Sequence, residues 1–375
     1  MSAVKTILPP AVIGIIGGGQ LGRMMALAAK AMGYRIASLD PQPGCPCAQI
    51  ADIEIIGDYG DSSAIESLAR ASDVITYEFE NINADALQWL EKNAHLPQGS
   101  LALKASQSRL AEKAAVARLG APVPRHLRIS GAEDLEKKVF FPSILKTDSG
   151  GYDGKGQAAL KTPADLPAAL DLARGAECVL EEWVPFDKEI SVIVARAQDG
   201  KTAAFPVAEN IHENGILRRT IAPARISESL GARAVECAER IAAGLEVVGI
   251  LAVEMFVIGN DFFINEIAPR PHNSGHFTMD ACATGQFEQH VRAVCALPLG
   301  DPSRLAPAVM ANILGEHLSR GLEPFLPLLG RGKLHLYGKA EARRGRKMGH
   351  LNMLCDGGHT IDDAMRSLDE SGIWN

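Results

Sequence analysis

The apolar and polar positions in the second half of the chain predict a β-hairpin. Two apolar runs, 251–258 and 262–267, flank Gly259-Asn260-Asp261, and a short glycine-containing loop between such runs is typical of a hairpin. Each run carries one acidic residue near its middle, Glu254 and Glu266. If the loop consists of those three residues, the two acids lie directly opposite each other and their side chains share a face.

Two opposed carboxylates among apolar neighbours would repel each other, and burial would raise the pKa of at least one. A hard divalent cation removes that conflict, and a site with few protein ligands suits Mg²⁺, which is usually completed by waters and phosphates. Segment 268–276 is rich in prolines and polar residues, so we expect a rigid loop that places a cation beside the metal. An ordinary hairpin with one solvated face fits the same pattern.

The N-terminal region alternates apolar runs with helical patterns, which predicts an α/β domain with a parallel sheet. The run 11–16 precedes Gly17-Gly18-Gly19-Gln20-Leu21-Gly22, and the next run ends in Asp40. This spacing matches the dinucleotide-binding fingerprint, although glycine amides at a helix N-terminus suit any phosphate. Glu78 follows a predicted strand at the edge where ligands bind, so it could accept hydrogen bonds from a ligand or be a solvated loop acid.

A second glycine-rich segment, 147–157, follows a predicted strand at 142–146. It contains four glycines between positions 150 and 156, with Lys146 before it and Lys155 within it. Such a segment offers amides and positive charge to phosphates, yet it lacks the Walker A pattern. A surface loop without a ligand would explain the glycines but not the lysines.

We expect three domains, at 1–121, 122–208 and 209–375. The first boundary follows a helical pattern that stops at Gly120, with prolines just beyond. The β-rich stretch up to 208, with a hairpin at 189–194 and 201–207, is expected to form a small lid.

Two later segments complete the prediction. The proline-rich segment 298–327 is expected to be irregular surface. A basic loop, 338–350, lies between two short predicted strands, and its cations and glycines suit either an anionic ligand or solvent.

The composition is that of an ordinary globular protein, with 47% hydrophobic and 22% charged residues. No apolar stretch approaches the ~20 residues of a membrane span, and the N-terminus is a poor signal peptide, so we expect no membrane association. The net charge of −7 argues against general nucleic-acid binding. Seven scattered cysteines indicate free thiols in a reducing cytoplasm.

Four motifs together make the sequence resemble the ATP-grasp superfamily and, within it, the 5-(carboxyamino)imidazole ribonucleotide synthetases. They are GGGQLGRM at 17–24, the segment 145–157, NEIAPRPHNSGH at 265–276 and GRKMGH at 345–350. The resemblance spans nearly the whole chain. The first motif alone is weak, but the four in this order are highly specific. Lys155 stands where many relatives carry Arg, which keeps the charge.

The resemblance implies an α/β ATP-grasp fold with an N-terminal Rossmann-like preATP-grasp domain, a small lid and a C-terminal ATP-binding domain that ends in a β-rich extension. In such enzymes ATP phosphorylates bicarbonate to carboxyphosphate, and the exocyclic amine of 5-aminoimidazole ribonucleotide is then carboxylated. The implied cofactors are ATP and Mg²⁺, and a homodimer is expected. The N-terminal glycines would then hold a substrate phosphate rather than NAD.

The resemblance also implies residue roles, with Glu254 and Glu266 holding Mg²⁺ on the ATP phosphates. The implied ATP-binding residues are Arg109, Lys146, Gly151, Tyr152, Asp153, Gly154, Lys155, Gly156, Gln157, Glu181, Glu182, Trp183, Val184, Glu189, His212, Asn265 and Glu266. The implied ligands of ribonucleotide and bicarbonate are Gln20, Glu78, Tyr152, Asp153, Arg270, His272, Asn273, Lys339, Arg346 and Lys347. The candidate catalytic residues are Asp153, Arg270, Tyr152 and Lys339. Asp153 would orient or deprotonate the amine, although released phosphate could be the base instead.

Three functions stay open on the sequence. The first is the carboxylating ATP-grasp ligase. The second is another ATP-grasp enzyme, such as a formate-using purine transformylase or a biotin-dependent carboxylase. The third, suggested by the first 40 residues, is an NAD-dependent dehydrogenase or a non-catalytic nucleotide-binding protein.

Overall fold

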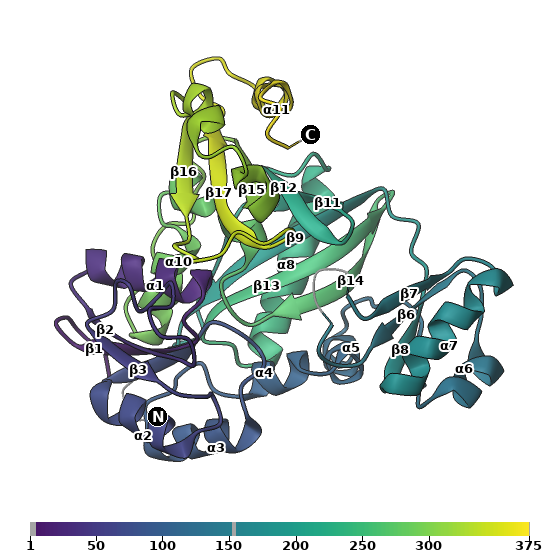
Figure 1. The fold of residues 1–375 in the computed structure, drawn as a ribbon, viewed down its shortest axis with the longest axis horizontal. Helices are drawn as coiled ribbons and strands as arrows, with labels where there is room; N and C mark the ends of the chain where they lie inside the picture. Colours follow the sequence, from purple (N-terminus) through teal and green to yellow (C-terminus); the bar gives the residue numbers. More distant parts are fainter. Residues whose placement is uncertain (1–4, 152–154, 375) are drawn as a thin grey trace.

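A computed structural model describes residues 5–151 and 155–374 of the chain. Three β-sheets organise it: a four-stranded parallel sheet, a four-stranded antiparallel sheet and a nine-stranded sheet. Figure 1 shows the large sheet in the centre, the parallel sheet on one side of it and the small antiparallel domain projecting from the other. The expected α/β class with three structural parts is confirmed.

The N-terminal domain is built on the parallel sheet, in the order β3-β2-β1-β4. Residues on one face of this sheet pack against α1, and residues on the other face pack against α2 and α3. The central strand β1 is therefore buried on both sides. The elements are β1 (Val12–Ile16), α1 (Gln20–Ala31), β2 (Arg35–Asp40), β3 (Ile53–Ile56), α2 (Ser62–Ala71), β4 (Val74–Tyr77), α3 (Ala84–Asn93) and α4 (Leu101–Ser106).

The small domain carries the antiparallel sheet, in the order β5-β8-β6-β7, with two helices that bury its core. Its elements are β5 (His126–Ile129), α6 (Ala132–Lys138), β6 (Ser143–Thr147), β7 (Gln157–Leu160), η1 (Pro163–Asp165), α7 (Leu166–Gly175) and β8 (Cys178–Glu182). The predicted lid, 122–208, was therefore too long. The hairpin expected near 189–207 belongs to the large sheet, because the buried run of β9 pairs with β13 and β11.

The large sheet has the order β14-β13-β9-β11-β12-β15-β17-β16, with β10 paired to β9. Helix α8 covers one face of β9 and β13, and the segment after β14 covers the other. Its strands are β9 (Lys188–Arg196), β10 (Thr202–Ala204), β11 (Ala208–Glu213), β12 (Ile216–Ala222), β13 (Gly249–Ile258), β14 (Asp261–Ala268), β15 (Ala308–Leu314), β16 (Gly332–Leu336) and β17 (Lys347–Leu354). The remaining elements are α5 (Arg109–Arg118), α8 (Glu228–Gly244), η2 (Asn273–Gly275), α9 (Thr278–Ala281), α10 (Gln286–Val294), η3 (Gly315–Leu318), η4 (Glu323–Leu328) and α11 (Ile361–Glu370).

Two expectations for the C-terminal part were wrong. The segment 298–327 is not irregular throughout, because it contains β15, in which every residue is buried. Its run of apolar residues, interrupted only by Asn312, has the length of a central strand. The basic loop is also shorter than 338–350, since β17 begins at Lys347 and pairs with β15 and β16.

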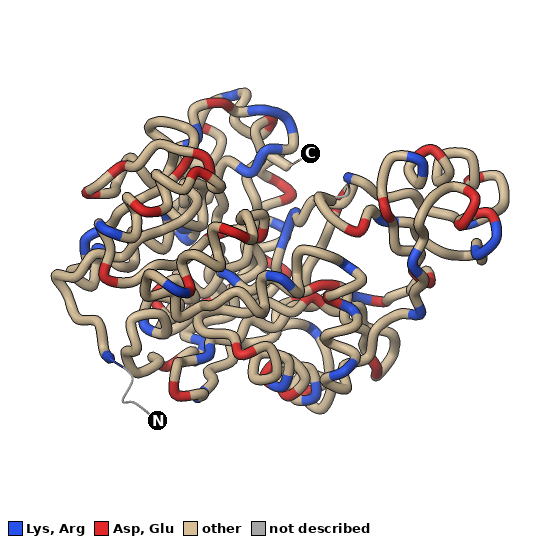
Figure 2. Tube along the Cα trace, turned by 90° about the horizontal axis from the view of Figure 1, so that it is seen from below, with Lys and Arg blue, Asp and Glu red and all other residues tan. Residues whose placement is uncertain are grey.

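The surface charges do not gather into one continuous stretch of the chain. Figure 2 shows Lys and Arg positions interspersed with Asp and Glu positions along the whole trace.

All seven cysteines are buried, free thiols, as the sequence predicted. Within residues 5–151 and 155–374, no helix has both the length and the apolar character that a membrane span needs.

Candidate active site

The two acids of the central hairpin face each other, as predicted, but the turn and the register of the strands differ from the expected ones. The turn has two residues, Gly259 and Asn260, because Ile258 pairs with Asp261. A regular ladder would then place Asn265 opposite Glu254. A bulge makes Asn265 an extra residue of β14, so that Glu254 pairs with Glu266.

The opposed carboxyl groups of Glu254 and Glu266 interact electrostatically. The side chain of Glu254 is only 13% exposed. Its burial and then the charge of Glu266 raise the pKa of Glu254 to about 7. Among the described residues no group of three or more His, Cys, Asp and Glu could hold a metal ion. A Mg²⁺ with few protein ligands is usually completed by phosphates and water, so these two carboxylates stay candidates for such an ion.

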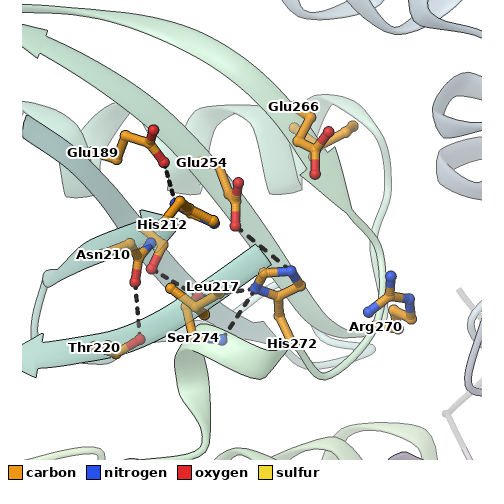
Figure 3. Close-up of polar contacts among 12 residues, drawn as sticks. Glu189, Asn210, His212, Leu217, Thr220, Glu254, Glu266, Arg270, His272 and Ser274 are labelled. Carbon is orange, nitrogen blue, oxygen red and sulfur yellow. Dashed lines mark hydrogen bonds and ion pairs between the residues drawn. The ribbon is translucent and has the colours of Figure 1, made fainter. Parts of the chain in front are cut away.

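Cationic and aromatic side chains surround this pair. Arg109 Nη1 lies 3.5 Å from Glu266 Oε2, and His272 Nε2 lies 3.6 Å from Glu254 Oε1. Figure 3 shows Glu254 and Glu266 on neighbouring strands, with His272 and Arg270 on the loop that follows them. On the other side of Glu254, Glu189 pairs with His212. Burial opposes protonation of His212, but the hydrogen bond and charge of Glu189 raise its pKa above the ordinary value.

A buried ion cluster lies between the lid and the hairpin. Glu181, on β8, accepts from Lys146 Nζ at 3.0 Å and lies 3.3 Å from Lys113 Nζ. Lys146 Nζ also lies 3.5 Å from Asn265 Oδ1. Burial raises the pKa of Glu181, but the two lysines outweigh burial and lower it. The Glu181 side chain therefore lies between two lysine side chains, a position beyond the backbone hinge that the resemblance implied.

The hinge segment has a fixed backbone. The Glu182 N–H donates to the Arg125 carbonyl at 2.8 Å, and the Trp183 N–H donates to the Pro142 carbonyl at 3.2 Å. Val184 is the second residue after β8, which ends at Glu182. The hinge segment, residues 181–184, therefore lies beside the buried lysines. The resemblance implied that this segment binds adenine.

The glycine-rich segment is tied to the first turn of α5. Asp148 accepts from the Arg109 N–H through its carbonyl and from the Leu110 N–H through Oδ1, both at 2.9 Å. The Thr147 N–H donates to the Gly156 carbonyl at 2.8 Å, which closes the base of the loop. Of the predicted loop residues, the structure describes Gly151, Lys155, Gly156 and Gln157, with Gln157 opening β7. Tyr152, Asp153 and Gly154 lie outside the described residues.

The N-terminal glycine turn already binds a carboxyl group of the protein itself, that of Glu78. This carboxylate accepts from the Gly19 N–H and, at 2.6 Å, from the Gly22 N–H. A Cβ at residue 19 would lie 2.6 Å from Glu78 Oε1, so the approach requires glycine. Glu78 therefore takes two of the amides expected for a substrate phosphate, and phosphate binding by this turn stays a prediction. Gln20 begins α1 beside them.

Asp40 is likewise engaged within the domain. Its Oδ2 accepts from the Gly18 N–H at 2.7 Å and from the Tyr59 hydroxyl at 2.6 Å. The dinucleotide fingerprint thus builds a self-contained turn, and neither its acid nor its amides are oriented to a free ribose or pyrophosphate.

The loop after β14 contains buried polar groups that lack a hydrogen-bond partner among the described residues. Arg270 donates to Glu80 at 2.7 Å and to the Pro271 carbonyl at 3.2 Å. Arg270 Nε and both amide atoms of Asn273 are buried without a hydrogen-bond partner in residues 5–151 and 155–374. His272 Nδ1 lies 2.9 Å from the Ser274 hydroxyl. Buried polar groups are normally satisfied, so these atoms mark the position of a polar ligand.

The basic loop lies at the junction between the first domain and the large sheet. Gln49 Nε2 donates to the Gly338 carbonyl at 2.8 Å, which joins the two. Lys339 Nζ donates to the Lys347 carbonyl at 2.7 Å, and Arg346 Nη1 donates to the Glu341 carbonyl at 3.1 Å. After burial and larger charge effects, the charge of Lys347 opposes the rise in the pKa of Glu254 and adds to the fall in the pKa of His272. The loop therefore adds positive charge near the acid pair.

The sequence analysis did not predict the contacts of several residues of this site. Lys113, Glu80 and Gln98 contact Glu181, Arg270 and the Pro269 carbonyl respectively. Lys113 had a signal, because it lies one helical turn after Arg109. The contacts of Glu80 and Gln98 join distant parts of the chain, so no local sequence pattern predicts them.

Comparison with known proteins gives matches over most of the chain. Family models match residues 11–107 as a ribonucleotide synthetase preATP-grasp domain, 114–287 as an ATP-grasp domain and 308–364 as a phosphoribosylaminoimidazole carboxylase C-terminal domain. The N5-carboxyaminoimidazole ribonucleotide synthase of Bacillus subtilis is 49% identical over 354 residues, which are 93% of each chain. The chain belongs to the N5-carboxyaminoimidazole ribonucleotide synthase family.

Solved structures of this family have the same fold. An N5-carboxyaminoimidazole ribonucleotide synthetase in complex with ADP matches with a TM-score of 0.94 and 54% identity, over 100% of this chain and 99% of that one. The enzyme of Aspergillus clavatus in complex with ADP and 5-aminoimidazole ribonucleotide matches with a TM-score of 0.87 and 29% identity, over 96% and 97%. The chain is thus an ATP-grasp ligase, and the dehydrogenase alternative is excluded.

Proposed function

We propose that this chain carboxylates 5-aminoimidazole ribonucleotide with bicarbonate and ATP, through carboxyphosphate, in purine biosynthesis. One observation carries the proposal: the opposed acids Glu254 and Glu266 lie next to a loop in which Arg270 and Asn273 hold unsatisfied buried polar atoms. A nucleotide phosphate and a small carboxyl anion would satisfy the two groups together. The expectations of a homodimer and of a cytoplasmic location belong to the same proposal.

The acid pair would hold Mg²⁺ on the triphosphate. When bound, this ion would offset the charge that develops during phosphoryl transfer. Arg109, at 3.5 Å from Glu266, and Lys146, fixed by Glu181 at 3.0 Å, would contribute cations to the same phosphates. Gly151, Lys155, Gly156 and Gln157 would close over them.

The nucleoside part of ATP would lie between the hinge and β9. Backbone groups of Glu181, Glu182, Trp183 and Val184 would bind adenine, since that segment already has a fixed backbone. Glu189 would accept from the ribose hydroxyls while His212 holds its carboxylate. Asn265 would contribute its side chain from the bulge, beside Lys146.

Bicarbonate would bind where Arg270 and Asn273 have unsatisfied atoms. A guanidinium matches a planar carboxyl anion in a bidentate way. Burial and then the charge of Arg270 lower the pKa of His272 well below its ordinary value, so His272 is a neutral partner here. Protein cations would lie on both sides of this anion. The protein would therefore catalyse its phosphorylation mostly by positioning the reactants and neutralising charge.

The ribonucleotide would lie between the first domain and the basic loop. Lys339, Arg346 and Lys347 would hold its phosphate, with Gln20 nearby, because the loop is joined to the first domain through Gln49. Glu78 would act on the aminoimidazole only if it left the glycine amides. Tyr152 and Asp153 remain hypotheses for contact with the base and for handling the amine proton.

Release of ADP with each substrate omitted in turn tests the proposal. We expect ADP only when ATP, bicarbonate and 5-aminoimidazole ribonucleotide are all present, and we expect the carboxylated amine as product. Formate in place of bicarbonate and added biotin distinguish the other ATP-grasp reactions. Equal ADP release with formate would contradict the proposal.

A further inference from the structure

The guanidinium of Arg270 is held by a carboxylate from another domain. Arg270 Nη2 donates to Glu80 Oε1 at 2.7 Å, and the two side chains are only 19% and 25% exposed. Glu80 follows β4 of the N-terminal domain, whereas Arg270 follows β14 of the large sheet. The contact therefore joins the first domain to the loop that carries the unsatisfied polar atoms.

The Glu80 side of this contact is fixed. Gln107 Nε2 donates to the Glu80 carbonyl at 2.7 Å and to the Ile82 carbonyl at 3.1 Å. Glu78, two residues earlier, is anchored by the amides of the glycine turn. The short segment between them has little freedom to carry Glu80 away from Arg270.

The Arg270 side is fixed by the same domain. Gln98 Nε2 donates to the Pro269 carbonyl at 2.8 Å, and Gln98 Oε1 accepts from Thr76 on β4 at 2.6 Å. The backbone before Arg270 and the guanidinium itself are thus both held from the first domain. Arg270 Nε is buried without a hydrogen-bond partner in the described part of the chain, so one donor of the guanidinium is left unsatisfied.

We infer that Glu80 is a positioning residue, which orients the Arg270 guanidinium so that its unsatisfied donor binds the carboxyl anion. This inference rests on the proposed role of Arg270 in binding bicarbonate. Glu80 also supplies the negative charge that balances a mostly buried guanidinium in the absence of substrate. Binding of bicarbonate then depends on the contact between the first domain and the large sheet.

The alternative is that Glu80 occupies the place of the anion and leaves when bicarbonate arrives. The fixed backbone at Glu80 and the unsatisfied Nε of Arg270 favour positioning, because a guanidinium donor is left for the ligand while Glu80 stays in place. The two ideas predict opposite effects of removing the Glu80 charge on the KM for bicarbonate.

Steady-state kinetics of Glu80→Gln test the inference. We expect the KM for bicarbonate to rise about tenfold, the effect of one charge-assisted hydrogen bond. We expect the KM for ATP to change less than about twofold. The ratio of ADP formed to ribonucleotide carboxylated should rise, because a loosely held anion is phosphorylated but not transferred. Glu80→Asp keeps the charge and should recover part of the affinity.

A matched control and a second variant keep the outcomes distinct. Glu288→Gln removes an acid that pairs with Arg292 at 2.6 Å within α10, and it should change none of these values. An unchanged or lowered KM for bicarbonate in Glu80→Gln would overturn the inference. Arg270→Ala tests the underlying assignment separately: if bicarbonate still binds normally in that variant, the proposed role of Arg270 fails as well.

Discussion

Asn265 brings Glu254 and Glu266 face to face, because this bulged residue of β14 compensates for a turn of only two residues. The same residue lies 3.5 Å from Lys146, which Glu181 holds in the buried ion cluster. One irregularity in the hairpin therefore sets the separation of the two acids and aligns a lysine with them. Bulges beside active sites commonly re-aim side chains in this way.

Replacing Glu266 with Gln should leave the fold intact and lower ATP turnover by about 10²-fold or more, the effect of losing one group that stabilises transition-state charge. ADP release and circular dichroism measure the two expectations. Asp261→Asn, at the exposed hairpin turn, is the control. Full activity of Glu266→Gln at ordinary magnesium concentrations would remove the metal assignment.

Replacing Lys347 with Ala should raise the KM for the ribonucleotide about tenfold and leave the KM for ATP nearly unchanged, because one charged contact to a phosphate is lost. Initial rates with each substrate varied in turn provide the measurement. Arg344→Ala removes an exposed cation of the same loop and should have little effect. Equal weakening of both substrates would show that Lys347 does not select the ribonucleotide.

Replacing Lys113 with Met should destabilise the protein by about 1–3 kcal/mol, because Glu181 would keep only one of its two buried partners. The KM for ATP should also rise, since Lys146 would be less firmly held. Denaturant unfolding and steady-state kinetics measure the two effects. Lys104→Met on the exposed side of α4 is the control. A more stable variant with normal ATP affinity would contradict the role of the cluster.

His290 gives a pH-dependent prediction. Burial lowers its pKa to about 3, while Ile250 N–H donates to Nδ1 and Thr76 Oγ1 lies 2.7 Å from Nε2. The unfolded chain binds a proton near pH 6.5 and the folded chain does not, so stability falls as the pH drops below 6.5.

Gln does not titrate, so the His290→Gln variant does not lose stability at low pH through this residue. In the parent protein this loss in the free energy of unfolding amounts to about 2 kcal/mol at pH 5. The variant should be less stable than the parent at pH 8, through lost hydrogen bonds, and the difference should narrow toward pH 5. Unfolding midpoints at several pH values measure this, with His126→Gln in the lid as the control. A difference independent of pH would contradict the neutral, buried His290.

Local patterns predicted the fold class and the central acids because periodicity and turn residues are properties of neighbouring positions. The pairing of Glu254 with Glu266 was correct, although its reasoning assumed a three-residue loop. Contacts between residues that are far apart in the sequence leave no such local pattern. The sheet to which β9 belongs, the capture of the glycine turn by Glu78 and the Glu80 contact with Arg270 all appear only when the domains are assembled.

The central claim is that ATP activates bicarbonate beside the acid pair. Isotopic oxygen tests this most directly: the reaction is run with ¹⁸O-labelled bicarbonate, and the released phosphate is analysed by mass spectrometry. The account predicts one bicarbonate oxygen in each phosphate, because the bridging oxygen of carboxyphosphate stays with phosphorus when the amine attacks carbon. Phosphate that contains only unlabelled oxygen would contradict the account.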